Sequence, residues 1–225
     1  MTRETLDRQL KEIYDEISAL SALVEHAMLD AVAALKQRDL DAARQIYAND
    51  QIINGKRFEI ENKALIMIAT QQPMARDLRV LASVLDIASE LERMGDYAKG
   101  IARIAILTGT EPPVKPIVEL PIMATITVDM LHRAVQAFID SDEVKALIIP
   151  KEDDQVDALY NQIYRDLLDI MTSDVSSVDR ATHLLWAAHN LERAADRVTN
   201  ICERTVFVAT GELTEIDSSD DESRI

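Results

Sequence analysis

Acidic residues recur with helical spacing in two distant segments of the chain. Glu92 and Asp96 are four residues apart, and so are Glu192 and Asp196. Side chains at this spacing are neighbours on a helix surface, where two like charges repel unless a counter-charge neutralises them. The surrounding pattern Leu-Glu-Arg-x-x-Asp, with an isoleucine five residues further on, recurs at the same offset of 100 residues. The pattern indicates one cation-binding position in each segment.

A second group of oxygen-bearing side chains precedes each Glu-Asp pair. Asp50 and Asn54 come before the first pair, and Asp153 and Asp157 come before the second. If the two helices in each segment pack beside one another, these oxygens converge with the Glu-Asp pair. Carboxylate and amide oxygens are ligands of hard cations such as magnesium, calcium, manganese and iron, and soft ligands for zinc or copper are scarce here. The residues do not distinguish among the hard cations.

A less specific explanation of the acid pairs is a solvated helix face. With 40 acids in 225 residues, chance alone produces about 7 acid pairs at this spacing. A single pair therefore carries little information, and Arg93, Arg193 and Arg197 are available as local counter-charges. The repetition of the whole pattern at one offset is what favours the metal hypothesis.

The other reactive residues form no recognisable catalytic pattern. The chain has no Glu-x-x-His pair, so it lacks the signature of a ferritin-like di-iron site, although His189 lies one turn before Glu192. Cys202 falls on the apolar stripe of its helix and is predicted to lie in the core, and Trp186 is predicted to be a packing residue. The sequence contains neither a nucleophile elbow nor a Walker loop, so it does not indicate a covalent or phosphoryl-transfer enzyme.

The elements that carry these residues are predicted to be helices. The chain has 5 glycines and 6 prolines in 225 residues, well under the roughly 12% that an ordinary protein contains. That is too few for the turns of a β-sandwich or the glycine loops of a Rossmann fold. Apolar residues recur every three to four positions, which predicts six helices, over 6–31, 46–67, 81–102, 126–139, 156–171 and 178–208. Pro150 predicts a kink or break where the fifth helix begins.

The six predicted helices form two copies of one unit. A shift of 103 residues places Ala31 on Ala134 and Asp50 on Asp153, and a shift of 100 superimposes the third helices. We therefore predict an all-α fold of two tandem antiparallel three-helix bundles related by an internal repeat, each with its own core. The expected parts are a first bundle, a proline-rich linker, a second bundle and an acidic disordered tail, over 1–108, 109–121, 122–213 and 214–225.

The charge balance excludes several classes of partner. The chain carries 24 basic and 40 acidic residues, a formal net charge of −16. A nucleic-acid binder needs a basic face, and direct docking on an anionic membrane needs one too. The single cysteine fits a reducing compartment, and the charged N-terminus is unlike a signal peptide. We expect no apolar run to span a membrane. We expect a soluble protein of the cytoplasm that binds no nucleic acid and does not insert into a membrane.

The repeated motif resembles the PhoU family of phosphate-signalling regulators. The similarity covers roughly 6–213 in both halves, and the segments that carry it are DQIIN, ALIMIATQQPMARDLR, ASELERMGDYAKGIARI, DDQVDALY and AHNLERAADRVTNICERTVFVATGEL. The resemblance implies no enzymatic activity and metal-binding acidic motifs on each bundle. Carried over by position, the implied metal ligands are Asp50, Glu92, Asp96, Asp153, Asp157, Glu192 and Asp196.

The resemblance also implies a role and partners. It implies an adaptor between the ATPase subunit of the phosphate-specific ABC transporter and the sensor histidine kinase, which represses the phosphate-starvation response and restrains phosphate uptake. Two positions depart from the family pattern in the first bundle, where Gly100 replaces an asparagine and Asn54 replaces an aspartate. Because both changes remove oxygen ligands or negative charge, we predict the stronger metal site in the second bundle.

Two other functions compete with the adaptor. One is a metalloenzyme, for example a hydrolase, that uses the clustered carboxylates. It is disfavoured because the carboxylates are expected on convex shoulders of the bundles without an obvious base. The other is a purely structural helical adaptor, similar in architecture to BAG-type chaperone modules. The sequence leaves open whether the chain is a monomer or a homodimer, which metal binds, where partners dock and whether phosphate itself binds.

Overall fold

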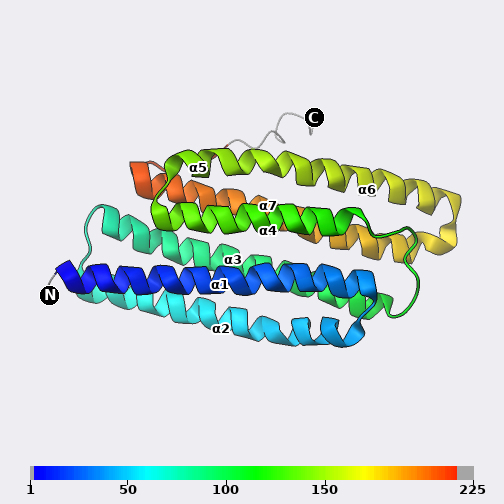
Figure 1. The fold of residues 1–225 in the computed structure, drawn as a ribbon, viewed down its shortest axis with the longest axis horizontal. Coiled ribbons are helices and arrows are strands. Elements are labelled where there is room, and N and C mark those ends of the chain that lie inside the picture. Colours follow the sequence, from blue (N-terminus) through cyan, green and yellow to red (C-terminus); the bar gives the residue numbers. More distant parts are fainter. Residues whose placement is uncertain (1–2, 217–225) are drawn as a thin grey trace.

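The computed structural model describes residues 3–216, and Figure 1 shows them as two layers of long antiparallel helices. The first layer contains α1 (Arg3–Gln37), α2 (Leu40–Gln71) and α3 (Arg76–Thr108). The second layer contains α4 (Glu119–Asp140), α5 (Glu143–Ile148), η1 (Ile149–Glu152), α6 (Asp153–Ser173), η2 (Val175–Ser177) and α7 (Val178–Thr210). No β-strand occurs in this part of the chain. The predicted pair of three-helix bundles is confirmed.

Local sequence signals set the helix boundaries at equivalent places in the two bundles. Asp39 accepts a hydrogen bond from the backbone N–H of Ala42 at 3.0 Å and caps α2. At the corresponding turn of the second bundle, Asp142 accepts one from the backbone N–H of Lys145 at 3.1 Å and caps α5. Such caps satisfy backbone donors that have no partner inside the helix. The two bundles thus share their first turn as well as their helices.

The middle helix differs between the bundles, as the proline at position 150 predicted. In the first bundle α2 runs unbroken for 32 residues. In the second bundle the same path is divided into α5, the 3₁₀ segment η1 that contains Pro150, and α6. Proline removes a backbone donor and cannot continue a helix interior. As a result Asp153 lies at the N-terminal end of α6, whereas its counterpart Asp50 lies inside α2.

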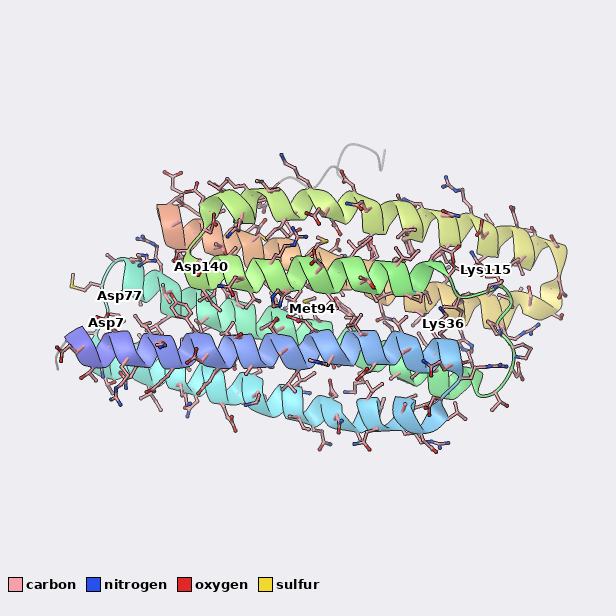
Figure 2. All side chains as sticks on the ribbon, viewed as in Figure 1. Asp7, Lys36, Asp77, Met94, Lys115 and Asp140 are labelled. Atoms are coloured by element: carbon pink, nitrogen blue, oxygen red, sulfur yellow. The ribbon has the colours of Figure 1, made fainter. Side chains whose placement is uncertain are left out.

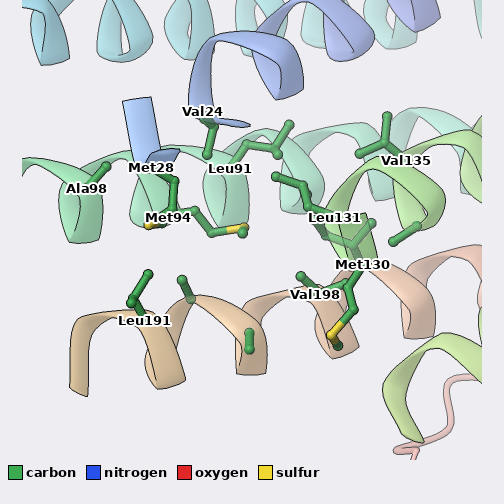
Figure 3. Packing of buried hydrophobic residues seen from close by; sticks show 14 of the residues in the cluster. Val24, Met28, Leu91, Met94, Ala98, Met130, Leu131, Val135, Leu191 and Val198 are labelled. Carbon is green, nitrogen blue, oxygen red and sulfur yellow. The ribbon is translucent and has the colours of Figure 1, made fainter. Parts of the chain in front are cut away.

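The two bundles share one core, so the expectation of two separate cores was wrong. A single cluster of buried apolar side chains runs through both layers. Figure 3 shows why: buried residues of α1, α3, α4 and α7 meet between the layers, among them Met28, Met94, Leu131 and Val198. Helix α1 contacts α4, and α3 contacts α7 along most of its length. Each bundle therefore leaves two helices with apolar surface that only the other bundle covers.

Polar side chains cover the outside of this core. Figure 2 shows Met94 at the middle of the molecule, between the layers. Asp7, Asp77 and Asp140 lie toward one end, and Lys36 and Lys115 lie near the opposite end, where the linker joins α3 to α4. Most charged residues remain in water while the apolar stripes of the helices pack inward, with Asp50, Asp153 and Glu192 as buried exceptions.

Two helices are apolar enough to resemble membrane spans, contrary to the expectation from sequence. They are the segment Glu4–Gln37 and α4, and about half of each apolar window is buried inside the fold. These are the helices that face one another across the two layers. Burial of their apolar faces in the shared core accounts for their hydropathy.

The linker between the two bundles is shorter than the predicted 109–121. Helix α3 ends at Thr108 and α4 begins at Glu119, so Pro121 stands in the first turn of α4, where proline is tolerated. At the other end, the backbone N–H of Ile216 donates to Glu203 Oε1 at 3.0 Å, and the Ile216 side chain packs on the core. The rest of the expected acidic tail, 217–225, lies outside the described residues.

Candidate metal centres

The first bundle brings its predicted acids together around a lysine. Lys99 Nζ donates to Asp50 Oδ2 at 2.7 Å and lies 3.6 Å from Asp96 Oδ1. Asn54 also donates to Asp50 Oδ2, at 2.9 Å. The Asp50 side chain is only 4% exposed, so its charge requires a nearby cation or donor. The Lys99 ammonium supplies that cation and bridges α2 to α3, and hydrogen bonding to Asp50 raises the pKa of Lys99.

Arg57 is the second basic residue of this centre, and it lies beside Glu92, the third acid. Arg57 Nη1 lies 3.7 Å from Glu92 Oε1, and Arg57 also pairs with Glu61 at 2.7 Å. Burial is the main cause that raises the pKa of Glu92, and the negative charge of Asp96 adds to it, whereas Arg57 acts in the opposite direction. Glu92 thus lies in a place where the fold only partly compensates its charge.

The second bundle has the same acids but lacks the matching bases. Under the shifts that relate the repeats, Arg57 corresponds to Tyr160 and Lys99 corresponds to Thr199. Asn54 corresponds to Asp157, which adds a further acid. The six positions of the first centre carry three acids, two bases and one asparagine, whereas the six matching positions of the second carry four acids and no base. This difference is visible in the sequence only when the repeats are compared for basic residues, and sequence reasoning overlooked it.

The acids of the second bundle have a histidine and an arginine among their partners. Asp153 and Glu192 are buried, at 3% and 6% exposure. His189 Nδ1 lies 3.2 Å from Glu192 Oε2, so the imidazole next to the acid motif does reach it. Arg193 pairs with Asp196 at 2.8 Å. Asp153 lies at the N-terminal end of α6, where the aligned peptide dipoles favour a negative charge.

The donor set of the second bundle fits a hard cation better than that of the first. In the first bundle the Lys99 ammonium already neutralises Asp50 and Asp96, so a metal ion has to displace it, although Asp50 Oδ1 is buried without a hydrogen-bond partner. In the second bundle the hydroxyl of Thr199 is buried beside the acid motif and has no hydrogen-bond partner. The acids Asp153, Asp157, Glu192 and Asp196 each interact with other groups of the fold.

Neither centre is preassembled in the present side-chain arrangement. Across residues 3–216, no three His, Cys, Asp or Glu side chains gather closely enough to hold one ion between them. The acids also differ in their exposure to solvent. In the first centre 52% of the Asp96 side chain is exposed, whereas in the second centre Glu192 is buried. The four acids of the second centre, which lie on α6 and α7, would have to reorient their carboxylates to share one ion.

Two residues that sequence reasoning connected with metal binding have another role. A Cβ atom at Gly100 would lie 3.0 Å from Asn190 Oδ1, so Gly100 allows α3 to approach α7 closely. Asn200, which corresponds to Gly100 in the repeat, donates to Glu90 Oε2 at 3.2 Å. Both positions thus belong to the contact between the bundles. In this structure the Asn200 amide nitrogen contacts Glu90 on α3.

The structure confirms the predicted burial of Cys202 but not the predicted packing role of Trp186. Cys202 is buried as predicted, and burial raises the pKa of its thiol to about 12. The prediction that Trp186 is a packing residue was wrong, because this side chain is 65% exposed.

Comparisons with known proteins agree with this architecture. The PhoU domain model matches the chain twice, over 17–105 and 120–205. A phosphate-specific transport system accessory protein PhoU homolog of Clostridium acetobutylicum is 35% identical over 96% of this chain and 99% of its own length. A homolog with the same name from Aquifex aeolicus is 35% identical over 92% of this chain and 94% of its own length.

A solved structure shows the same fold. The crystal structure of PhoU from Pseudomonas aeruginosa superimposes with a TM-score of 0.86 at 31% sequence identity, covering 92% of this chain and 99% of the other. The family model thus matches both halves of the chain, and the relatives share its length and its two-bundle fold. The chain belongs to the PhoU family.

Proposed function

We propose that this protein is a cytoplasmic regulator of phosphate homeostasis that acts with a phosphate-specific transport system. The observation that carries the proposal is the full-length similarity to proteins named as accessory proteins of such systems, across both bundles. In this role the chain connects the ATPase subunit of the phosphate transporter to the sensor histidine kinase. It represses the phosphate-starvation response and restrains uptake when phosphate is plentiful. The role is regulatory, and the protein acts through binding.

We also propose that the second bundle holds a metal ion through Asp153, Asp157, Glu192 and Asp196. Its four acids have no lysine or arginine at the two positions that neutralise the first centre, and the Thr199 hydroxyl is buried beside them. A hard cation such as iron, manganese, magnesium or calcium supplies the positive charge that Lys99 and Arg57 supply in the first bundle. When bound, the ion would tie α6 to α7 as Lys99 ties α2 to α3.

A titration of Mn²⁺ against matched variants tests the metal proposal. Asp196→Asn should abolish binding measured by calorimetry, whereas Asp96→Asn should leave it unchanged within about twofold. Metal that binds only the folded state also raises its stability, by about 2.7 kcal/mol at a concentration of a hundred dissociation constants. Equal losses in the two variants would contradict the asymmetry between the bundles.

A binding experiment with purified partners tests the adaptor proposal. The full chain is mixed with the transporter ATPase subunit, or with the cytoplasmic part of the sensor kinase, at high and low phosphate. Complex formation with either partner, together with metal analysis of the same sample, is the expected result. Recovery of neither partner would overturn the adaptor role.

A further inference from the structure

A groove lies along the contact between α3 and α7 at the linker end of the molecule. It has a volume of about 410 Å³. Its floor is the close approach of Gly100 to Asn190, and its walls carry Arg103 and Leu107 on α3 and His183 and Trp186 on α7. Leu107 is 59% exposed and Trp186 is 65% exposed. Two large apolar side chains on facing walls therefore remain in water.

The internal repeat shows that the fold does not require this groove. Helices α3 and α7 correspond to one another, so the other end of their contact is built from equivalent positions. There Asn200 donates to Glu90 at 3.2 Å and Arg204 pairs with Asp86 at 3.3 Å, which links the two helices. In the groove the residue equivalent to Asp86 is Trp186 and the residue equivalent to Asn200 is Gly100. Polar links that join the helices at one end are replaced by an open apolar surface at the other.

The charge of the groove is opposite to that of the chain. None of its lining residues is acidic, although the chain has 40 acids. Arg103 is exposed, and within residues 3–216 it forms no salt bridge. An adjoining hollow shares Ile104 with the groove and contains Arg38 and Arg180, which donate to the linker carbonyls of Thr110 and Pro112. Glu111 is the one acid that lines this second hollow.

We propose that this groove docks a protein segment that carries an apolar anchor and a carboxylate. The anchor inserts between Leu107 and Trp186, and the carboxylate pairs with Arg103. Tryptophan and arginine are enriched among residues that dominate binding energy at protein interfaces. The inference rests on the proposed adaptor function, since it names the surface through which one partner binds.

The shape of the groove favours a protein segment over a small ligand. Pockets for small molecules enclose most of the ligand surface. Here the two apolar walls stay mostly exposed, so a small molecule would remain largely in water. A helix or strand of a partner can instead cover both walls at once and continue onto the neighbouring arginines.

The experiment uses Trp186 as its own reporter, because it is the single tryptophan of the chain. The full-length protein is labelled with 5-fluorotryptophan, which yields one fluorine resonance. It is mixed with the purified transporter ATPase subunit and, separately, with the cytoplasmic part of the sensor kinase. Affinities of unlabelled variants are measured by calorimetry, and their thermal unfolding confirms that each variant is folded.

One of the two partners should shift or broaden the Trp186 resonance. Trp186→Ala and Arg103→Glu should each weaken that complex by at least about tenfold. Phe58→Ala and Arg165→Glu are matched controls at exposed positions on α2 and α6, and they should change the affinity by less than about twofold.

The outcomes separate this inference from the proposed function. A partner that binds with equal affinity to wild type and to the Trp186 and Arg103 variants overturns the groove assignment and leaves the adaptor role standing. Binding of neither partner overturns both. A wild-type dimer that Trp186→Ala converts to a monomer, with partner affinity unchanged, assigns the groove to a second copy and also overturns the inference.

Discussion

Replacing Lys99 by methionine is expected to destabilise the protein by about 3 kcal/mol. Methionine keeps an apolar stem of the same length, with sulfur in place of one methylene, and removes the ammonium. The variant leaves the Asp50 carboxylate, which is 4% exposed, without the cation that lies 2.7 Å away. Removing one partner of a buried ion pair costs more than the pair contributes, because the remaining charge is still buried.

The magnitude follows from the contacts of Asp50. At 2.7 Å and an effective dielectric constant of about 20, the Coulomb attraction lost is about 6 kcal/mol. Two features reduce the net cost. Lys99 is 31% exposed and regains part of its hydration on unfolding, and Asn54 still donates to Asp50 Oδ2 at 2.9 Å. For a chain of this size, a loss of about 3 kcal/mol lowers the Tm by about 6–12 °C.

The assay is urea unfolding followed by circular dichroism in metal-free buffer. Lys11→Met is the matched control, because Lys11 is exposed on α1, and it should change stability by less than about 0.5 kcal/mol. The double variant Asp50→Asn/Lys99→Met removes both charges and should recover about 2 kcal/mol of the loss. If Lys99→Met equals the Lys11 control, or if the double variant recovers nothing, Asp50 does not depend on the ammonium and the reasoning is refuted.

Three further predictions follow from the same structure. Gly95→Ala should destabilise the folded protein by about 1–3 kcal/mol, because the new Cβ would lie 3.0 Å from Ile53 Cγ2. Gly55 has open space around it, so Gly55→Ala should stabilise the folded protein by about 0.5–1 kcal/mol. The midpoints of urea unfolding measure both effects. Burial raises the pKa of Glu92, so the folded state keeps this proton to a higher pH than the unfolded state, and ionisation lowers stability as pH rises. Glu92→Gln should therefore gain stability relative to wild type as the pH rises above the ordinary glutamate pKa of 4.5 in denaturant titrations, and a constant difference would contradict this. The Cys202 thiol, with a pKa of about 12, should react with a disulfide reagent at neutral pH only after unfolding, and rapid reaction of the folded protein would show that the core is open there.

The residues that could carry chemistry were recognisable from local spacing. Acids four residues apart must be neighbours on a helix, and their recurrence at one offset identified the repeat without any knowledge of packing. The same periodicity located the helices, and Pro150 located the break before α6. These features depend on contacts within one turn, which the sequence determines by itself.

What happens between helices required the tertiary structure. Lys99 lies three residues after Asp96, but its shortest contact is with Asp50, 49 residues away on α2. Periodicity shows which face of a helix is apolar but not which partner covers it. The shared core of α1, α3, α4 and α7 and the exposure of Trp186 were therefore beyond reach of the sequence pattern.

The sequence by itself determined the two repeats, their helices and the acids on each third helix. Only the tertiary structure decided that the two repeats share one core, and that Lys99 and Arg57 pair with the acids of the first bundle. It also decided that polar links join α3 to α7 at one end of their contact, whereas a groove lies between them at the other end. The physical reason is range. Helix formation and side-chain spacing are set by neighbours within four residues, whereas charge compensation and interface closure depend on residues that folding alone brings together.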